Sequence, residues 1–188
     1  MIKIPTLYYR DPAEPSRVTE QVAPGCEWVI AGEGVATQKF DGVNVQATVR
    51  GEVIVSVQKR RNPTAEEKLQ GLEPRYIPTN AEDPADKHIL AAAAGTDTED
   101  WPDGDWSCEA IGPKIQGGVE IRDHTFLIPF GLPMWPVNHA IFAPRGFVDL
   151  RDFLEGCAIE GIVWHHPDGR MAKIKRRDFG HRWPLRKP

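Results

Sequence analysis

The chain has 188 residues and a formal net charge of −4. Its length suits one globular domain, and its content of 40% hydrophobic and 27% charged residues excludes wholesale disorder. Three cysteines without a Cys-x-x-Cys pair exclude a disulfide framework and favour a reducing cytosol. No apolar run is long enough for a membrane span and the first residues do not form a secretory signal, so we expect a cytoplasmic protein without a membrane partner.

The first half of the chain carries strand signals followed by helix signals. The apolar run at 28–31 predicts a short buried strand, and polar–apolar alternation over 43–50 and 52–58 predicts a β-hairpin. Thr64, with Glu67 three residues later, predicts a helix that begins with a capping box. A second helix is predicted from the Asp-Pro pair at 83–84 to the glycine at 95, because proline suits a helix start and glycine a helix end.

The second half returns to short strands. We expect an acidic loop at 96–105, strands at 106–110 and 125–130, and a helix at 147–155. Two more strands, at 159–164 and 171–175, flank the turn sequence His166-Pro167-Asp168-Gly169. Strands predominate, so we predict a single α+β domain over residues 1–188, with mainly antiparallel sheets and a few flanking helices.

The first candidate site is Lys39-Phe40-Asp41-Gly42-Val43-Asn44, between the predicted strand at 28–31 and the hairpin. A lysine before a sharp Asp-Gly turn suits a nucleophile, provided that desolvation or a neighbouring cation removes its proton. A surface lysine before an ordinary turn explains the same residues.

The second candidate is the predicted hairpin at 159–175. A four-residue turn at 166–169 would place Ile162 opposite Lys173 and Glu160 opposite Lys175, all on one face together with Trp164 and Met171. Two lysines and a carboxylate on one face suit a polyphosphate with a metal ion. The alternative is a cross-strand ion pair on an exposed face.

The third candidate is Glu109, which ends a predicted strand and precedes a loop rich in glycine and proline at 112–118. Such a loop lets the backbone approach a ligand closely. An ordinary turn with an exposed glutamate is the alternative.

Taken in order, these segments resemble the covalent nucleotidyltransferase superfamily of ATP-dependent polynucleotide ligases and mRNA capping enzymes. The resemblance runs from about residue 38 to 175 and rests on Lys39-x-Asp-Gly, Glu109, Glu160-Gly-x-Val and Lys173-x-Lys175. Asn44 and the run Glu-x-x-Gly-Pro-x-Ile-Gln from 109 are most similar to the RNA ligase 2 class of phage enzymes. The resemblance implies an ATP-grasp-like nucleotidyltransferase domain of the ligase type. Ligases and capping enzymes usually carry a further domain after the last lysine motif, but only 13 residues follow Lys175, so we expect no C-terminal oligonucleotide-binding barrel.

The resemblance also implies a role for each matching residue. Lys39 would take AMP from ATP, while Lys173 and Lys175 would hold the α-phosphate and favour an unprotonated Lys39. The remaining nucleotide contacts would be Gln38 beside the base, Asn44 and Arg60 on phosphates, Glu109 on the ribose, Phe130 stacked on the adenine, and Glu160 through Mg²⁺ or Mn²⁺. Arg61 is the rival of Arg60, and Phe126 is the rival of Phe130.

The implied function is an ATP-dependent RNA ligase that joins a 5′-phosphate to a 3′-hydroxyl through a lysyl-AMP intermediate. A DNA ligase, a capping-type guanylyltransferase and a non-catalytic nucleic-acid-binding remnant are the alternatives. The basic segment 176–188 would replace part of the missing domain by gripping strand phosphates, unless a partner protein supplies that domain or the segment is a solvated tail. Its candidate contacts are Arg176, Arg177, Arg182, Arg186 and Lys187.

Overall fold

The computed structural model describes residues 4–120, 123–130, 132, 136 and 139–184. Short helices and antiparallel sheets make up these residues, which confirms the predicted α+β class. The chain divides into two compact units: an insert unit of residues 41–135, and a terminal unit of residues 2–40 and 136–188. The assignment of residues 1–188 to a single adenylyltransferase domain stays a prediction.

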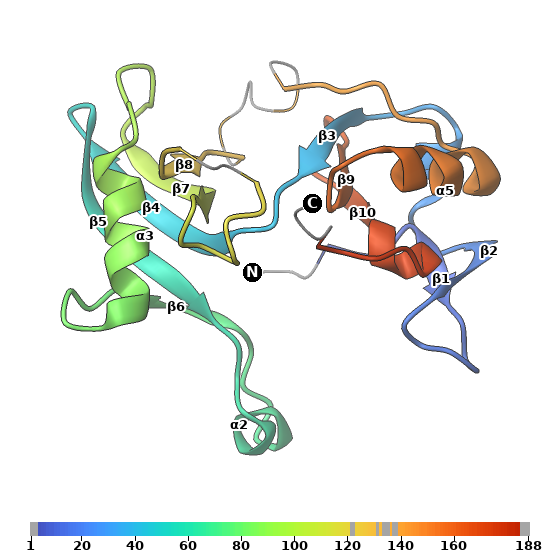
Figure 1. The fold of residues 1–188 in the computed structure, drawn as a ribbon, viewed down its shortest axis with the longest axis horizontal. Coiled ribbons are helices and arrows are strands. Elements are labelled where there is room, and N and C mark those ends of the chain that lie inside the picture. The colour runs from blue at the N-terminus through green and yellow to red at the C-terminus, as the bar shows by residue number, and fades with distance from the viewer. Residues whose placement is uncertain (1–3, 121–122, 131, 133–135, 137–138, 185–188) are drawn as a thin grey trace. The chain divides into compact units, whose positions relative to one another are not determined.

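The insert unit is built on a five-stranded antiparallel sheet in the order β6-β5-β4-β7-β8 (Figure 1). Its strands are β4 (Val43–Arg50), β5 (Val53–Arg61), β6 (Arg75–Pro78), β7 (Gly104–Ile111) and β8 (Phe126–Ile128). The predicted β4–β5 hairpin is confirmed, and its turn residues Gly51 and Glu52 both have positive φ. The expected loop at 96–105 ends where β7 begins, and the predicted strand at 125–130 is shorter than expected.

One face of this sheet is apolar and carries the core of the insert unit. Alternate residues of β4 are buried on this face with Cys108 and Leu127, and helix α3 (Pro84–Ala94) packs Ile89 and Ala92 against them. The opposite face is mainly polar: it carries Asn44, Gln46 and Thr48 of β4 and Asp105, Ser107 and Glu109 of β7, with the buried Ile111 at its end. The sheet therefore uses one face for stability and presents the other for polar contacts.

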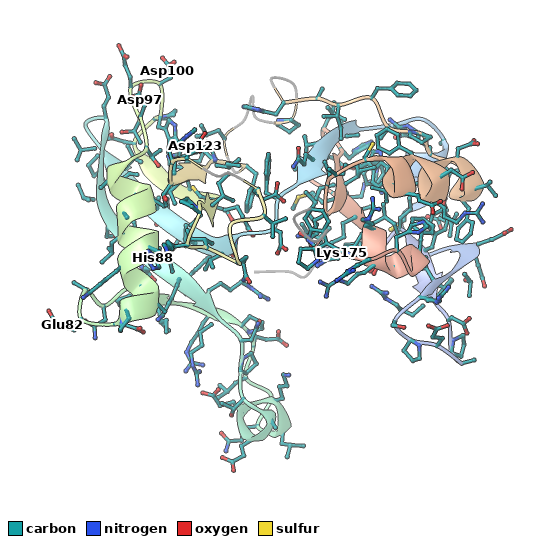
Figure 2. The ribbon with its side chains drawn as sticks, viewed as in Figure 1. Glu82, His88, Asp97, Asp100, Asp123 and Lys175 are labelled. Carbon is teal, nitrogen blue, oxygen red and sulfur yellow. The ribbon has the colours of Figure 1, made fainter. Side chains whose placement is uncertain are left out.

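Both predicted helix starts in the insert unit are confirmed. Thr64 and Glu67 form the reciprocal capping box of α2 (Ala65–Leu69), which lies at the tip of the connection between β5 and β6 (Figure 1). Asp83 accepts a hydrogen bond from the Ala85 amide at the start of α3, which ends at Gly95. Asp97 and Asp100, in the acidic loop, follow α3 (Figure 2).

The terminal unit is built on a three-stranded antiparallel sheet in the order β10-β9-β3, joined by a two-stranded sheet. Its strands are β1 (Tyr8–Arg10), β2 (Val18–Val22), β3 (Val35–Lys39), β9 (Gly161–His165) and β10 (Met171–Lys175). Its helices are α1 (Glu27–Ile30), α5 (Phe147–Gly156) and the 3₁₀ helix η1 (Arg176–Phe179). Ile162, Trp164 and Ile174 are fully buried against Leu150 and Leu154 of α5, and this cluster is the core of the unit.

The run at 28–31 is helical rather than extended, which corrects the strand prediction. Trp28 and Val29 are buried as expected, but they belong to the four-residue helix α1. A short apolar run does not by itself distinguish a buried strand from a buried helical turn. The strand that precedes the catalytic-type motif is β3, whose last residue is Lys39.

The register of the β9–β10 hairpin differs by one residue from the prediction. Lys173 lies opposite Val163, and Lys175 lies opposite Gly161. The chain turns through three residues between His166 and Arg170, with Gly169 at φ 90°, instead of through four. This loop is the type that favours glycine at its left-handed last position. Consequently Ile162, Trp164, Ala172 and Ile174 share the buried face, and the lysines lie on the other face.

None of the helices in the described part of the chain has the length and apolar character needed to cross a membrane.

Candidate functional site

Three lysines lie on one face of the terminal-unit sheet. Lys39 of β3 and Lys175 of β10 are both partners of Gly161 on the central strand β9, one from each side. Lys173 lies two residues before Lys175 and therefore on the same face. Because paired residues on neighbouring strands share a face, the three lysines form one basic surface. The sequence predicted this grouping for Lys173 and Lys175, although through a different register.

Gly161 keeps the centre of this surface open. A Cβ atom at this position would overlap the carbonyl oxygen of Ile174 and would approach the Cα of Lys175. Any larger residue would therefore push β10 away from β9 next to Lys175. The glycine of the Glu-Gly-x-Val sequence has a steric explanation that is independent of any family resemblance.

Glu160, directly before β9, joins the lysines through its carboxylate. Its Oε2 lies 2.5 Å from the Lys39 Nζ, and its Oε1 lies 2.7 Å from the Lys175 Nζ (Lys175 is labelled in Figure 2). Glu160 is 3% exposed, so the carboxylate sits between two ammonium groups with little water around it. The predicted contact of Glu160 with Lys175 is present, but it is buried, which contradicts the alternative of an exposed ion pair. The contact of Glu160 with Lys39 was not anticipated.

The carboxylate of Glu160 is the candidate ligand for a metal ion, but the described residues place no cluster of further metal-ligating side chains around it. Among the described residues no group of three or more His, Cys, Asp or Glu side chains is arranged to hold an ion. Magnesium commonly binds through one or two carboxylates together with substrate phosphates. A single carboxylate suits a divalent ion that arrives with a nucleotide, and the expected Mg²⁺ or Mn²⁺ stays a prediction.

A half-buried histidine occupies the same face as the lysines. His165 lies opposite Val35 on β3, and its Nε2 is 3.0 Å from the Thr37 Oγ1. Burial lowers the pKa of His165 to about 4, because the imidazolium ion loses hydration there. His165 is consequently uncharged at neutral pH and adds no positive charge beside the lysines. His165 was not predicted as part of this face, because it belongs to a His-His pair that flanks the turn.

The polar face of the insert unit brings together residues from all five strands of the sheet. Asn44 lies opposite Glu109, Arg60 lies opposite Tyr76, and Glu109 lies opposite Ile128. The antiparallel β4–β5 ladder pairs Val45 with Lys59. Continuing this register by one residue places Arg60 opposite Asn44. The sequence predicted Asn44, Arg60 and Glu109 as nucleotide contacts, and the structure places all three in one row across the sheet.

Two glutamates of the insert unit hold the backbone that follows Lys39. The Asp41 amide donates to the Glu120 Oε1 at 2.8 Å, and the Gly42 amide donates to the Glu109 Oε1 at 3.2 Å. A Cβ on Gly42 would overlap the carbonyl oxygen of Ala110, so the Asp-Gly turn packs directly on β7. Glu120 was not predicted, because it lies outside the motifs and its contact depends on the tertiary fold.

The structure bears on the two open alternatives in the predicted set. Arg61 forms an ion pair with Glu67 of α2 at 2.8 Å, whereas the Arg60 Nε is buried without a hydrogen-bond partner among the described residues. Phe126 lies within β8 on the face of Glu109, while Phe130 follows the strand in a turn. These placements favour Arg60 over Arg61 and Phe126 over Phe130.

Gln38 is on the other face of β3 from Lys39, because neighbouring residues of a strand alternate. Its partner is the buried residue Ile162. Gln38 therefore does not lie on the lysine face, and its expected contact with a base stays a prediction.

Arg176 has a structural role that corrects its assignment as a phosphate contact. It is 7% exposed, and its guanidinium group donates to the carbonyl oxygens of Leu154, Glu155 and Cys157 at the end of α5 and to that of Arg182. The side chain thus satisfies carbonyl groups that a helix end leaves unpaired.

The rest of the basic segment divides between surface and core. Arg177 and Arg182 are exposed, and Phe179 is buried against Tyr8 and Phe147. The segment therefore covers the core at Phe179, and its exposed arginines remain candidates for contact with a strand. Arg186 and Lys187, the other predicted contacts, lie outside the described residues.

Comparison with known proteins finds a partial similarity. RNA ligase 1 of Rattus norvegicus and RNA ligase 1 of Pongo abelii are each 35% identical to this chain over 91 residues, and RNA ligase 1 of Danio rerio is 29% identical over 91 residues. These matches cover 41% of this chain but only 25% of the length of each relative. No family model matches the chain.

The chain therefore has distant, partial similarity to RNA ligase 1. The matched relatives agree with the RNA ligase character predicted from the motifs. The narrower resemblance to the RNA ligase 2 class is untested.

Proposed function

We propose that this protein is an ATP-dependent RNA ligase that acts through a covalent lysyl-AMP intermediate on Lys39. The observation that carries the proposal is the contact of the Lys39 Nζ with the buried carboxylate of Glu160, which Lys175 shares. Burying the Glu160 carboxylate costs desolvation free energy, and the two lysines, whose side chains are 20% and 27% exposed, offset that cost while remaining accessible to a ligand. The partial similarity to RNA ligase 1 supplies independent support.

The first step needs Lys39 as a neutral amine with a lone pair. The Glu160 Oε2 is within hydrogen-bond distance of the Lys39 Nζ and is the group placed to accept its proton. The amine then attacks the α-phosphorus of ATP, an N–P bond forms, and the bond to the β-phosphate breaks as pyrophosphate leaves. Lys173 and Lys175 would neutralise the negative charge that develops on the α-phosphate oxygens.

The second and third steps transfer AMP and seal the strand. A 5′-phosphate oxygen attacks the phosphorus of lysyl-AMP, the N–P bond breaks, and Lys39 recovers its proton. A 3′-hydroxyl then attacks the activated 5′-phosphate, a phosphodiester bond forms, and AMP leaves. Positioning and charge neutralisation account for most of the catalysis in such displacements.

The substrate contacts follow from the same proposal. Mg²⁺ or Mn²⁺ would enter with the phosphates of ATP and would neutralise phosphate charge. Glu160 would be its protein ligand once the Lys39 proton has passed from the carboxylate to water. In the insert unit Asn44 and Arg60 would contact phosphates, Glu109 the ribose, and Phe126 or Phe130 the adenine. The strand partners would be RNA ends in the cytoplasm, contacted through Arg177 and Arg182, and the ligase would be of the RNA ligase 2 class.

The test is the intact mass of the protein after incubation with ATP and Mg²⁺. We expect an increase by one AMP, its loss in Lys39→Arg, and mapping of the modified peptide to Lys39. Lys59→Arg is the matched control, because Lys59 also pairs with a buried carboxylate, the Asp86 Oδ1 at 2.6 Å, and has a similar exposure to Lys39. Normal labelling of Lys39→Arg would refute the proposal.

The same assay separates the alternatives. Labelling by GTP in place of ATP would indicate a capping-type guanylyltransferase. Joining of DNA ends in preference to RNA ends would indicate a DNA ligase. Absence of any adduct in the intact protein, with retained nucleic-acid binding, would indicate a non-catalytic remnant.

A further inference from the structure

The hydroxyl group of Tyr76 is part of a hydrogen-bond chain on the polar face of the insert unit. It lies 3.1 Å from the Asn44 Oδ1 and 3.4 Å from the Ser107 Oγ. The Asn44 Nδ2 in turn donates to the Cys108 carbonyl oxygen at 3.1 Å. Tyr76 comes from β6, Asn44 from β4 and Ser107 from β7, so the chain depends on the folded sheet.

The direction of each hydrogen bond follows from the groups involved. The Asn44 Oδ1 can only accept, so the single hydroxyl proton of Tyr76 goes to it. Ser107 must then donate to the Tyr76 oxygen. A tyrosine hydroxyl is protonated at neutral pH, and burial raises the pKa of Tyr76 further above its ordinary value.

This arrangement fixes which atoms of the Asn44 amide are available. An amide can present either its acceptor oxygen or its donor nitrogen to a ligand, and the two choices differ by a 180° flip. With Oδ1 held by Tyr76 and one Nδ2 hydrogen held by Cys108, what Asn44 offers is its second N–H. An N–H suits an anion, whereas the oxygen would repel one.

A second donor lies beside it. Arg60 is the cross-strand partner of Tyr76, and its Nε is buried without a hydrogen-bond partner among the residues that the structure describes. Its Nη1 donates to the Asn62 Oδ1 at 2.8 Å, which fixes the guanidinium group at its far end. Two donors on neighbouring strands, with Tyr76 next to both, make a preorganised anion site.

We infer that Tyr76 is a positioning residue that orients the Asn44 amide so that Asn44 donates, together with Arg60, to a phosphate group of the bound nucleotide. The inference rests on the proposed function, because the proposed function identifies the ligand as ATP. It adds a residue that no motif contains and states which atom of Asn44 is used. It predicts that Tyr76 affects recognition of the phosphates and leaves recognition of the nucleoside unchanged.

The test compares the binding of ATP with the binding of adenosine, measured by calorimetry on the full chain. Tyr76→Phe removes the hydroxyl and keeps the ring. We expect it to weaken ATP binding about fivefold, the effect of one hydrogen bond, and to leave adenosine binding unchanged. Ser107→Ala, which removes the donor to Tyr76, should have a smaller effect in the same direction.

A double-mutant cycle distinguishes positioning from a general structural effect. With Asn44→Ala already present, Tyr76→Phe should cause no further loss of ATP affinity. Tyr8→Phe is the matched control, because the Tyr8 hydroxyl donates to the Arg145 carbonyl oxygen at 3.0 Å in the terminal unit. We expect it to lower thermal stability without changing ATP affinity.

The outcomes separate this inference from the proposed function. Equal loss of ATP and adenosine binding in Tyr76→Phe, or additive losses with Asn44→Ala, would overturn the inference even if lysyl-AMP forms. Selective loss of ATP binding in a protein that never forms lysyl-AMP would support the inference and refute the ligase. A wild-type chain that binds no ATP would overturn both.

Discussion

Replacing Glu160 by Gln tests the central contact of the terminal unit. The substitution keeps the size of the side chain and removes the charge that Lys39 and Lys175 share. Removing one member of a buried ion pair costs about 3–5 kcal/mol, because the remaining charge is left uncompensated. Here the Lys39 and Lys175 side chains are 20% and 27% exposed, so water recovers part of that loss. We therefore expect a loss of about 2 kcal/mol in the free energy of unfolding.

For a protein of this size, that loss corresponds to a fall in Tm of about 4–8 °C. The rate of lysyl-AMP formation should fall much further, about 10²- to 10⁴-fold, because the proton acceptor of Lys39 is lost. The rate is measured by quenched-flow labelling at a temperature at which thermal denaturation shows the variant to be fully folded. The two effects are then separated.

Asp86→Asn is the matched control. Asp86 is a 1% exposed carboxylate that holds Lys59 in the insert unit, so its loss should reduce Tm by a similar amount. It should leave the rate of lysyl-AMP formation within about threefold of the wild type. If Glu160→Gln kept the full rate while folded, or if Asp86→Asn lost as much rate, the assignment of a chemical role to Glu160 would be wrong.

The remaining predictions concern pH, the helix cap and the strand contacts. The pKa of His165 is about 4 in the folded protein against an ordinary value of 6.5, so between these pH values the unfolded chain binds a proton that the folded chain does not. The free energy of unfolding should therefore fall by about 2 kcal/mol as the pH drops from 6.5 to 4. Chemical denaturation at several pH values should show a flatter pH dependence for His165→Gln. Arg176→Met should lower the free energy of unfolding by about 2–4 kcal/mol, since two carbonyls of α5 and that of Cys157 just after it lose their donor. It should not change the salt dependence of RNA binding. Arg177→Ala and Arg182→Ala should each reduce the slope of log affinity against log salt by about 0.7 for single-stranded RNA, and an unchanged slope would exclude them from the strand contact.

Local chemistry made several elements predictable from sequence. The capping box of Thr64 and Glu67 and the cap at Asp83 are contacts within three residues, so the sequence contains both partners. The β4–β5 hairpin follows from alternation and a two-residue turn. The motif residues Lys39, Glu109 and Glu160 were identified because their order along the chain is distinctive, although their contacts were not.

Other features depended on residues that are far apart in the chain. The helical form of Trp28 and Val29 is set by packing, because a short apolar run is compatible with either structure. The hairpin register was missed because Gly169 allows a three-residue loop, and one residue of shift moves the lysines to the other face.

Sequence by itself determined the fold class, the helix caps and the set of residues that could carry nucleotidyl transfer, because these depend on local contacts, periodicity and motif order. Only the tertiary structure decided what those residues touch. It placed Glu160 between Lys39 and Lys175, which are distant along the chain, and it buried Arg176 under the end of α5. It also brought Tyr76 to Asn44. Each of these contacts is a long-range pairing between strands or helix ends, which burial and sheet register select and which no local pattern encodes.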